Sequence, residues 1–188
     1  MRTLFPLAYG LLIVFASPVI AQSLESSDWS SWGGPNRDFS VLRGSSKPLR
    51  TPRLVWERSL GDGHSAVVVD GEHCYCQYSA GKTEFVQKRN LQNGELIWET
   101  DYPVSMQSSR YPGPHATPAI SQGKLVTASI DGQIHAFDVE SGESIWRIDL
   151  VREFGTTLPQ SGYASSPLII DDLVIVPTLG KAQARETE

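Results

Sequence analysis

Two histidines stand at similar places in the chain, each shortly before a stretch rich in apolar residues. His64 precedes residues 65–71, and His115 precedes residues 117–121. An imidazole that recurs in this way could bind an anion or a metal ion, because the ring offers both a hydrogen-bond donor and a ligand nitrogen. The alternative is that each histidine is a half-exposed loop residue without a ligand.

A cationic and an aromatic residue lie close to the second histidine. Arg110 and Tyr111 fall within residues 101–116, a segment that is long for a link between two strands. Their guanidinium and phenol groups could clamp a carboxylate or stack on a planar ring. A solvated loop without a ligand is again the alternative.

A second long segment, residues 149–165, contains Arg152 and Tyr163. It occupies the same place in the chain pattern as the segment that holds His115. No residue is predicted to be catalytic, and none is predicted to bind a metal. The ligand-facing candidates are His64, Arg110, Tyr111, His115 and Tyr163.

Cys74 and Cys76 are separated by one residue in a segment that is typical of a strand. In that conformation both thiols face the same side, with Cα atoms about 6.5–7 Å apart, at or beyond the usual limit for a disulfide. Free structural thiols, a strained disulfide, and metal or redox chemistry are the three interpretations. His73 and His135 also fall within predicted strands, where we expect satisfied or exposed side chains without a ligand.

A repeat with a period near 49 residues organises these segments. Residues 93–98 (NGELIW) recur as residues 141–146 (SGESIW), and residues 117–120 (TPAI) recur as residues 166–169 (SPLI). Residues 54–57 (LVWE) match the tryptophan-bearing end of the unit. A fixed period of this length indicates an architecture of stacked units.

Each unit predicts a meander of four short antiparallel strands. In the best copy the turns fall at Gln122-Gly123, at Asp131-Gly132 and at residues 140–142. Asp131-Gly132 predicts a two-residue hairpin turn of type I′. We therefore expect strands at residues 118–121, 124–130, 133–139 and 143–148.

A four-stranded meander cannot bury both of its faces by itself. Radial stacking of such sheets does so, which predicts a β-propeller. The recurring tryptophans, Trp56, Trp98 and Trp146, are each expected to fill the wedge between adjacent blades as structural residues. Ligand stacking is the alternative for them.

Residues 131–146 (DGQIHAFDVESGESIW) resemble the pyrroloquinoline-quinone-type (PQQ-like) β-propeller repeat almost position for position. Residues 90–98 are a second match, and residues 162–170 resemble the opening of a third. Residues 29–38 (WSSWGGPNRD) resemble the segment that leads into the propeller in exported bacterial members. The resemblance covers roughly residues 29–180 and implies an all-β fold.

The resemblance also implies about six to eight blades, which 188 residues cannot supply. We expect an incomplete propeller of about 2.5 four-stranded antiparallel blades, and a chain that is a fragment of a longer propeller. The expected organisation is a signal peptide (1–21), an N-terminal segment (22–52), the partial propeller (53–180) and a polar tail (181–188).

The first 21 residues predict export. An apolar run at residues 4–15 follows Arg2 and precedes Val19-Ile20-Ala21, a pattern typical of a signal peptide cleaved after Ala21. The run is shorter than the roughly 20 residues of a spanning helix, so we expect no transmembrane anchor in the mature chain. We expect the mature chain in the periplasm or outside the cell. A net charge of −5 argues against nucleic-acid binding.

Three functional interpretations follow. The favoured one is an exported binding or scaffold module that presents its loops to a protein or polymer ligand, for which no cofactor is predicted. The resemblance implies an alternative, a PQQ-dependent dehydrogenase acting on alcohols, sugars or polyvinyl alcohol, with PQQ and calcium as cofactors. The third is a truncated product without a function of its own.

Overall fold

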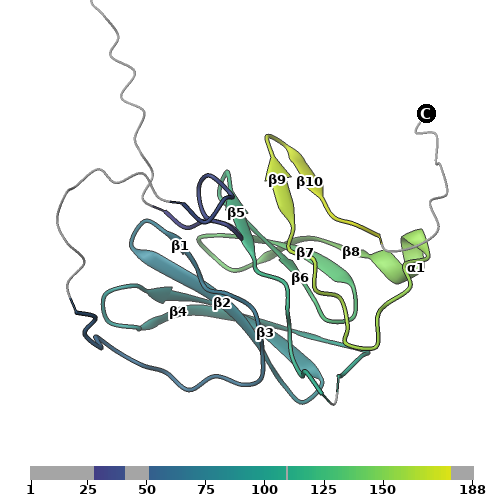
Figure 1. Cartoon of the computed structure of the whole chain (residues 1–188), viewed down its shortest axis with the longest axis horizontal. Helices are drawn as coiled ribbons and strands as arrows, with labels where there is room; N and C mark the ends of the chain where they lie inside the picture. Colours follow the sequence, from purple (N-terminus) through teal and green to yellow (C-terminus); the bar gives the residue numbers. More distant parts are fainter. Residues whose placement is uncertain (1–27, 41–50, 109, 179–188) are drawn as a thin grey trace, which may run out of the picture.

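Antiparallel sheets make up the computed structural model, which describes residues 28–40, 51–108 and 110–178 (Figure 1). The first sheet, blade 1, contains β1 (Val68–Asp70), β2 (His73–Ala80), β3 (Thr83–Asn90) and β4 (Leu96–Pro103). Blade 2 contains β5 (Ala119–Ser121), β6 (Lys124–Ala128), β7 (Gln133–Asp138) and β8 (Ser144–Asp149). A short helix, α1 (Leu150–Phe154), follows β8, and a hairpin of β9 (Leu168–Ile170) and β10 (Leu173–Ile175) comes last.

Neighbouring strands in each sheet are also consecutive in the chain, with β1 and β5 as the first strands of their blades. This order is the predicted meander. The two complete blades and the hairpin confirm an all-β fold of propeller blades that is incomplete in this chain. In blade 2, the strands begin and end within two residues of the predicted positions.

One turn differs from its predicted type. Gln122 and Gly123 both adopt positive φ, at 49° and 72°, as a type I′ turn requires. At Asp131-Gly132 only the glycine does, at 84°. There β6 ends already at Ala128, and the Gly132 N–H donates to the Ser129 carbonyl at 3.1 Å. The wider turn leaves the Asp131 carboxylate free to accept hydrogen bonds from neighbouring groups.

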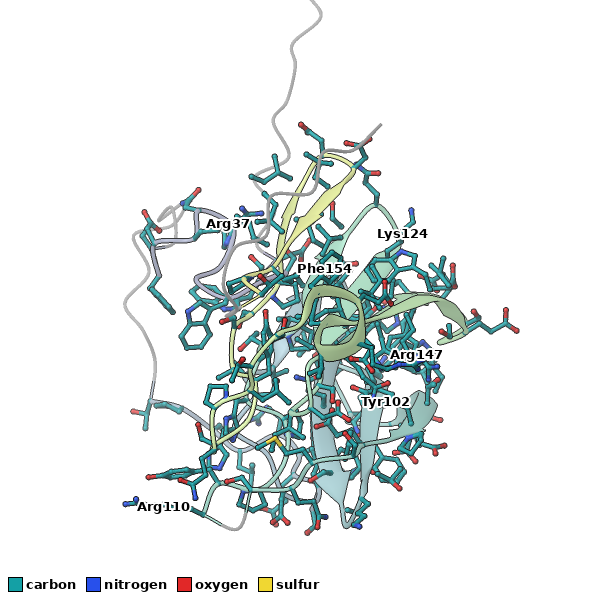
Figure 2. All side chains as sticks on the ribbon, turned by 90° about the vertical axis from the view of Figure 1, so that its right-hand side faces the viewer. Arg37, Tyr102, Arg110, Lys124, Arg147 and Phe154 are labelled. Carbon is teal, nitrogen blue, oxygen red and sulfur yellow. The ribbon has the colours of Figure 1, made fainter. Side chains whose placement is uncertain are left out.

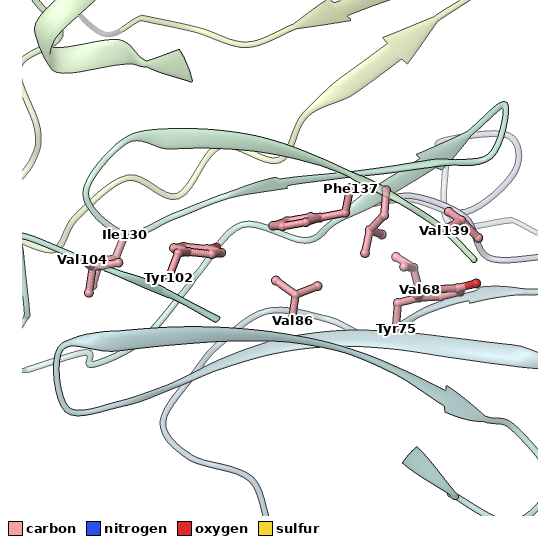
Figure 3. Packing of buried hydrophobic residues seen from close by; sticks show 9 residues of the cluster. Val68, Tyr75, Val86, Tyr102, Val104, Ile130, Phe137 and Val139 are labelled. Carbon is pink, nitrogen blue, oxygen red and sulfur yellow. The ribbon is translucent and has the colours of Figure 1, made fainter. Parts of the chain in front are cut away.

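The main hydrophobic core lies between the two blades. Figure 3 shows its side chains pointing toward one another from the two sheets. Val86 and Leu125 are fully buried and Phe137 is 1% exposed, which places β3, β6 and β7 at the centre of this interface. Burying a side chain of this size contributes about 1.5–3 kcal/mol. The remaining buried members are Val68, Tyr75, Tyr102, Val104, Ile130 and Val139.

Tryptophans on successive segments dock on the next blade in the same way. The Trp98 indole N–H donates to the Val139 carbonyl at 3.0 Å, and the Trp56 indole N–H donates to the Leu91 carbonyl at 2.9 Å. A glycine lies under each ring, where an added Cβ would come within 2.6 Å of the indole. Both glycines also adopt positive φ, at 69° for Gly94 and 74° for Gly142. The repeated glycine therefore allows both the turn and the close approach of the ring.

Trp146 packs between blade 2 and the last hairpin. It contacts a second core cluster in which Ile134 and Tyr163 are buried and Ile169 and Val174 are half-buried. All three repeated tryptophans thus lie at contacts between successive segments of the repeat.

The segment around Trp29 runs along the first strands of the blades. The Val69 N–H donates to the Trp29 carbonyl at 2.9 Å, and the Ile120 N–H donates to the Ser30 carbonyl at 2.8 Å. The Arg37 guanidinium donates to the Ile169 carbonyl. The edges of β1 and β5 that are not paired within their sheets are therefore covered here by the chain itself.

The predicted signal peptide, residues 1–21, and the polar tail, residues 181–188, lie outside the described residues. Within the described ranges, no helix has the length and apolar character that a membrane span needs.

Candidate functional site

Three loops precede the first strands of the blades and of the last hairpin. In a closed propeller the blades surround a central channel, and because these loops lead into the first strand of each blade we call residues 59–67, 104–118 (without residue 109) and 155–167 the channel loops. The first two are fitted tightly together: the His64 N–H donates to the Pro114 carbonyl at 2.8 Å. A Cβ added at Gly113, whose φ is 83°, would lie 2.2 Å from the Asp62 carbonyl oxygen. Only glycine fits at position 113, and this contact holds the two loops in register.

The fitted loops bring three aromatic rings together. The His64 and His115 ring centroids lie 5.1 Å apart and nearly perpendicular, at 81°. The Tyr111 ring lies 6.0 Å from His64 and 6.5 Å from His115, also edge to face. His115 Nε2 lies 3.0 Å from the Tyr111 carbonyl oxygen, which fixes its ring orientation. The Arg110 guanidinium carbon lies 5.4 Å from the centre of the Tyr111 ring.

A surface cavity of about 550 Å³ opens beside this cluster. It lies between the second and third channel loops. Figure 2 shows Arg110 at the edge of the molecule, extending away from the ribbon. The lining residues are Gln107, Ser108, Arg110, Tyr111, Gln160 and Ser161. The cavity thus combines a cation, an aromatic ring, two amides and two hydroxyls, groups that bind polar or anionic ligands.

Two residues from the third loop region lie elsewhere. Tyr163 is fully buried, and its hydroxyl donates to the Pro177 carbonyl at 2.9 Å, so it packs in the second core cluster rather than facing a ligand. Arg152 lies on α1 and lines a different cavity, of about 410 Å³, together with Arg147 and Asp149. Of the predicted ligand-facing residues, the structure brings together His64, Arg110, Tyr111 and His115.

A buried carboxyl group between the blades was not predicted. Glu84 on β3 is fully buried and accepts hydrogen bonds from the Ile130 N–H at 3.0 Å and the Tyr102 hydroxyl at 3.1 Å. Burial raises its pKa to about 7, although both hydrogen bonds act in the opposite direction. Its signal in the sequence is that Glu84 alternates with Val86 and so shares its face of the strand.

Two further ionisable groups, Asp131 and His135, lie near Glu84 or its partner Tyr102. The His135 ring stacks on Tyr102 with centroids 3.9 Å apart, and burial, helped by the charge of Arg147, lowers the His135 pKa to about 4. Burial acts to raise the Asp131 pKa, but hydrogen bonds from Ser129, Ser105 and Gln133 outweigh it and hold that pKa below its usual value. His135 is therefore neutral at pH 7, and it is buried with an Nε2 atom that has no hydrogen-bond partner among the described residues, so it is neither satisfied nor exposed as predicted.

A sequence model of the family described as "Outer membrane protein assembly factor BamB" matches residues 82–186, more than half of the chain. The chain belongs to the PQQ-like β-propeller repeat family. This agrees with the resemblance carried by residues 131–146 and with the blades of the structure.

Several known proteins are similar to this PQQ-like chain. Quinohemoprotein alcohol dehydrogenase ADH-IIG of Pseudomonas putida is 24% identical over 172 residues, which cover 84% of this chain and 22% of that protein. BamB of Alkalilimnicola ehrlichii is 36% identical over 59 residues, which cover 31% of this chain and 15% of that protein. The chain therefore spans less than a quarter of the length of either relative.

One solved structure supports the fold. The quinohemoprotein alcohol dehydrogenase from Comamonas testosteroni superimposes with a TM-score of 0.57 at 19% identity, covering 82% of this chain and 23% of that chain. At this identity, the likeness shows the propeller fold and nothing of the chemistry.

The described residues of this PQQ-like chain do not by themselves form a quinone and calcium site. Among the described residues, no three His, Cys, Asp or Glu side chains are grouped so that they could hold a metal ion. Cys74 and Cys76 are free thiols, and burial raises the Cys76 pKa to about 11. Cys74 lies about 16 Å along β2 from Ser79, which pairs with Asp62 of the channel loops. We therefore derive no chemical step through either cofactor.

Proposed function

We propose that the chain is part of an exported, non-catalytic binding propeller that holds a protein or polymer ligand at its channel loops. The observation that carries this proposal is the ring cluster of His64, Tyr111 and His115, held by fitted loops beside a cavity of about 550 Å³. Binding surfaces fixed before the ligand arrives lose little conformational entropy on association.

The rest of the fold supports a scaffold role. The docking of Trp56 and Trp98 fixes each segment against the next blade, so the loops are mounted on a rigid support. Export is supported by the pattern of residues 1–21 and by the family description, which names an outer membrane protein assembly factor. The proposed organisation keeps the leader (1–21), the N-terminal segment (22–52), the partial propeller (53–180) and the tail (181–188).

A photo-crosslinking amino acid tests the position of the binding surface. We would place p-benzoylphenylalanine at Tyr111, which is 43% exposed, and in a separate variant at Ile145 on β8, which is 46% exposed. Irradiation in cells that express the full chain is expected to give discrete adducts from position 111 and not from position 145. Equal labelling at both positions, or none at 111, would contradict the proposal.

The second candidate function is a quinone-dependent dehydrogenase. It is favoured by the alignment with the Pseudomonas putida alcohol dehydrogenase, which covers 84% of this chain. Its test is dye-linked alcohol oxidation after incubation of the purified protein with PQQ and calcium. We expect no dye reduction above a control without quinone. Sustained dye reduction together with the absorbance of bound quinone would replace the binding proposal.

A further inference from the structure

The cavity beside the ring cluster has an unusual lining for a chain with a net charge of −5. Among the described residues, its lining contains no carboxylate and no aliphatic side chain. Apart from Tyr111, every lining residue carries an amide, a hydroxyl or a guanidinium, namely Gln107, Ser108, Arg110, Gln160 and Ser161. The site is therefore polar and carries positive charge on a protein that is acidic as a whole.

The Arg110 guanidinium is available to bind an anion. Its side chain lies beside the face of Tyr111, and within the described part of the chain it forms no ion pair. A guanidinium is planar and carries its N–H donors in a fork that matches the two oxygens of a carboxylate. With no acidic group in the lining to neutralise it, this fork is available to a ligand.

The other groups suit a ligand rich in hydroxyls. The Ser108 hydroxyl already accepts a hydrogen bond from the Tyr111 N–H at 3.1 Å, so its own hydrogen is left to donate. The amides of Gln107 and Gln160 each offer donors and an acceptor. The Tyr111 ring is 43% exposed and gives a flat apolar surface beside them. Sugar rings present this same combination of an apolar face and a rim of hydroxyls.

A peptide ligand fits the site less well. Peptides are held chiefly by apolar or aromatic anchors in pockets, or by strand addition to a free sheet edge. The lining has no aliphatic pocket. The edge of β1 is already hydrogen-bonded to the Trp29 carbonyl and the edge of β5 to the Ser30 carbonyl, so neither edge is free for strand addition at these positions.

We propose that the cavity lined by Gln107, Ser108, Arg110, Tyr111, Gln160 and Ser161 binds a carboxylate-bearing saccharide, such as a segment of a uronic-acid polymer. Arg110 holds the carboxylate, Tyr111 supports the face of a sugar ring, and the amides and hydroxyls bind the ring hydroxyls. This inference rests on the proposed function, because it names the ligand of the same loops.

The test is calorimetric titration of the full chain with three probes. They are a short oligogalacturonate, an oligoglutamate of the same length and charge, and a neutral galactose oligomer. We expect the oligogalacturonate to bind about tenfold or more tightly than either of the others, because only it combines charge with ring hydroxyls. Equal binding of oligoglutamate would overturn the saccharide assignment, and equal binding of the neutral oligomer would overturn the role of the carboxylate.

Variants of Arg110 test whether oligogalacturonate binds in this cavity. Arg110→Ala is expected to weaken oligogalacturonate binding about tenfold or more, because a charge-assisted pair is lost. Arg110→Lys keeps the charge without the fork of N–H donors, so its affinity for oligogalacturonate should lie between those of the wild type and Arg110→Ala. The matched control is Arg58→Ala, which removes another arginine stacked on an aromatic ring, 5.9 Å from the centre of Trp56 and outside the cavity. An unchanged affinity in Arg110→Ala with an unchanged thermal midpoint would overturn the proposal.

The two proposals fail in different ways. If oligogalacturonate does not bind but the photo-crosslinker at position 111 still gives discrete adducts, the ligand assignment is wrong and the binding propeller stands. If neither experiment gives a signal, both are wrong.

Discussion

Blade 1 has a docked tryptophan on each side, Trp56 from the segment before it and its own Trp98 toward blade 2, yet the two contacts differ in what surrounds them. Trp98 lies beside Tyr75, with ring centroids 6.1 Å apart, and packs against the core shared by two complete sheets. Trp56 makes the matching hydrogen bond, but its neighbours Leu54 and Val55 are 73% and 63% exposed. The same local contact is thus surrounded by a hydrophobic core at Trp98 and by exposed residues at Trp56.

This difference separates two sources of stability. The indole hydrogen bond and the glycine under the ring are local features, so they form wherever the short sequence pattern recurs. Burial needs an opposing sheet, and in the described residues only the Trp98 side has four strands on both sides of the ring. The docking motif therefore specifies which segments meet, while the stabilisation comes from the sheets that it brings together.

The largest effect is expected for Trp98→Ala. Removing a large ring from a packed core costs about 3–5 kcal/mol, whereas Trp56→Ala, at the margin, is expected to cost less than half as much. The free energy of unfolding from urea titration followed by far-UV circular dichroism gives both values. Equal losses in the two variants would show that the docking contact, and not the core around it, sets the stability.

The glycines under the two rings sharpen the comparison. Gly142→Ala and Gly94→Ala both place a Cβ within 2.6 Å of an indole and force alanine to a positive φ. The backbone strain alone costs about 1–2 kcal/mol in each variant. Trp98 cannot shift without disturbing the core, so Gly142→Ala is expected to lose about 1 kcal/mol more than Gly94→Ala. If Gly142→Ala and Gly94→Ala lowered the urea midpoint equally, Trp98 and Trp56 would be equally able to shift away from the added methyl group.

Much of this arrangement could be predicted from the sequence, because it depends on short repeated patterns. The spacing of residues 93–98 and 141–146 predicted the blades, and His64 and His115 were recognised as histidines at matching places before two of the strands. Tyr163 lies at a similar place before β9, but its ring is taken up by the second core cluster. Pattern alone does not show whether a loop side chain turns inward, since that depends on the space left by the sheets.

Glu84 could not be predicted for the same reason. Its burial arises from the contact of blade 1 with the turn that carries Ile130, a contact between segments 46 residues apart. Asp131 likewise acquires its hydrogen bond from the Ser105 N–H, at 2.7 Å, only when the blades meet. Polar groups between blades are a product of packing, which local spacing does not specify.

The pH dependence of the interface tests this buried acid. Because the Glu84 pKa is raised from 4.5 to about 7, the folded state holds a proton that the unfolded state has already lost between these values. The free energy of unfolding therefore falls as pH rises from about 4.5 to 7. In Glu84→Gln this part of the decline should vanish, leaving the variant more stable than the wild type at pH 8 by on the order of 3 kcal/mol.

The measurement is urea unfolding of both proteins at pH 4.5, 6 and 8. The two should differ least at the lowest pH, where Glu84 is protonated in the folded state and about half protonated in the unfolded state, and should diverge above it. Trp56→Ala is the control, because it weakens the other side of blade 1 and leaves the Glu84 contacts in place. Its free energy of unfolding should therefore keep the wild-type dependence on pH. A constant difference between Glu84→Gln and the wild type at all three pH values would mean that Glu84 does not titrate in this range.

The smallest effect is expected where the interface reaches solvent. The Lys88 ammonium lies 3.0 Å from the Glu140 carboxylate of blade 2, with the lysine side chain 2% and the glutamate side chain 83% exposed. Because water screens the exposed partner, Glu140→Ala should cost only about 0.5–1 kcal/mol, and less in high salt. Glu143→Ala, at an exposed position on the same turn region, is the charge-matched control and should change stability little. A loss from Glu140→Ala as large as that from Trp98→Ala would show that this ion pair, rather than the packed core, holds the blades together.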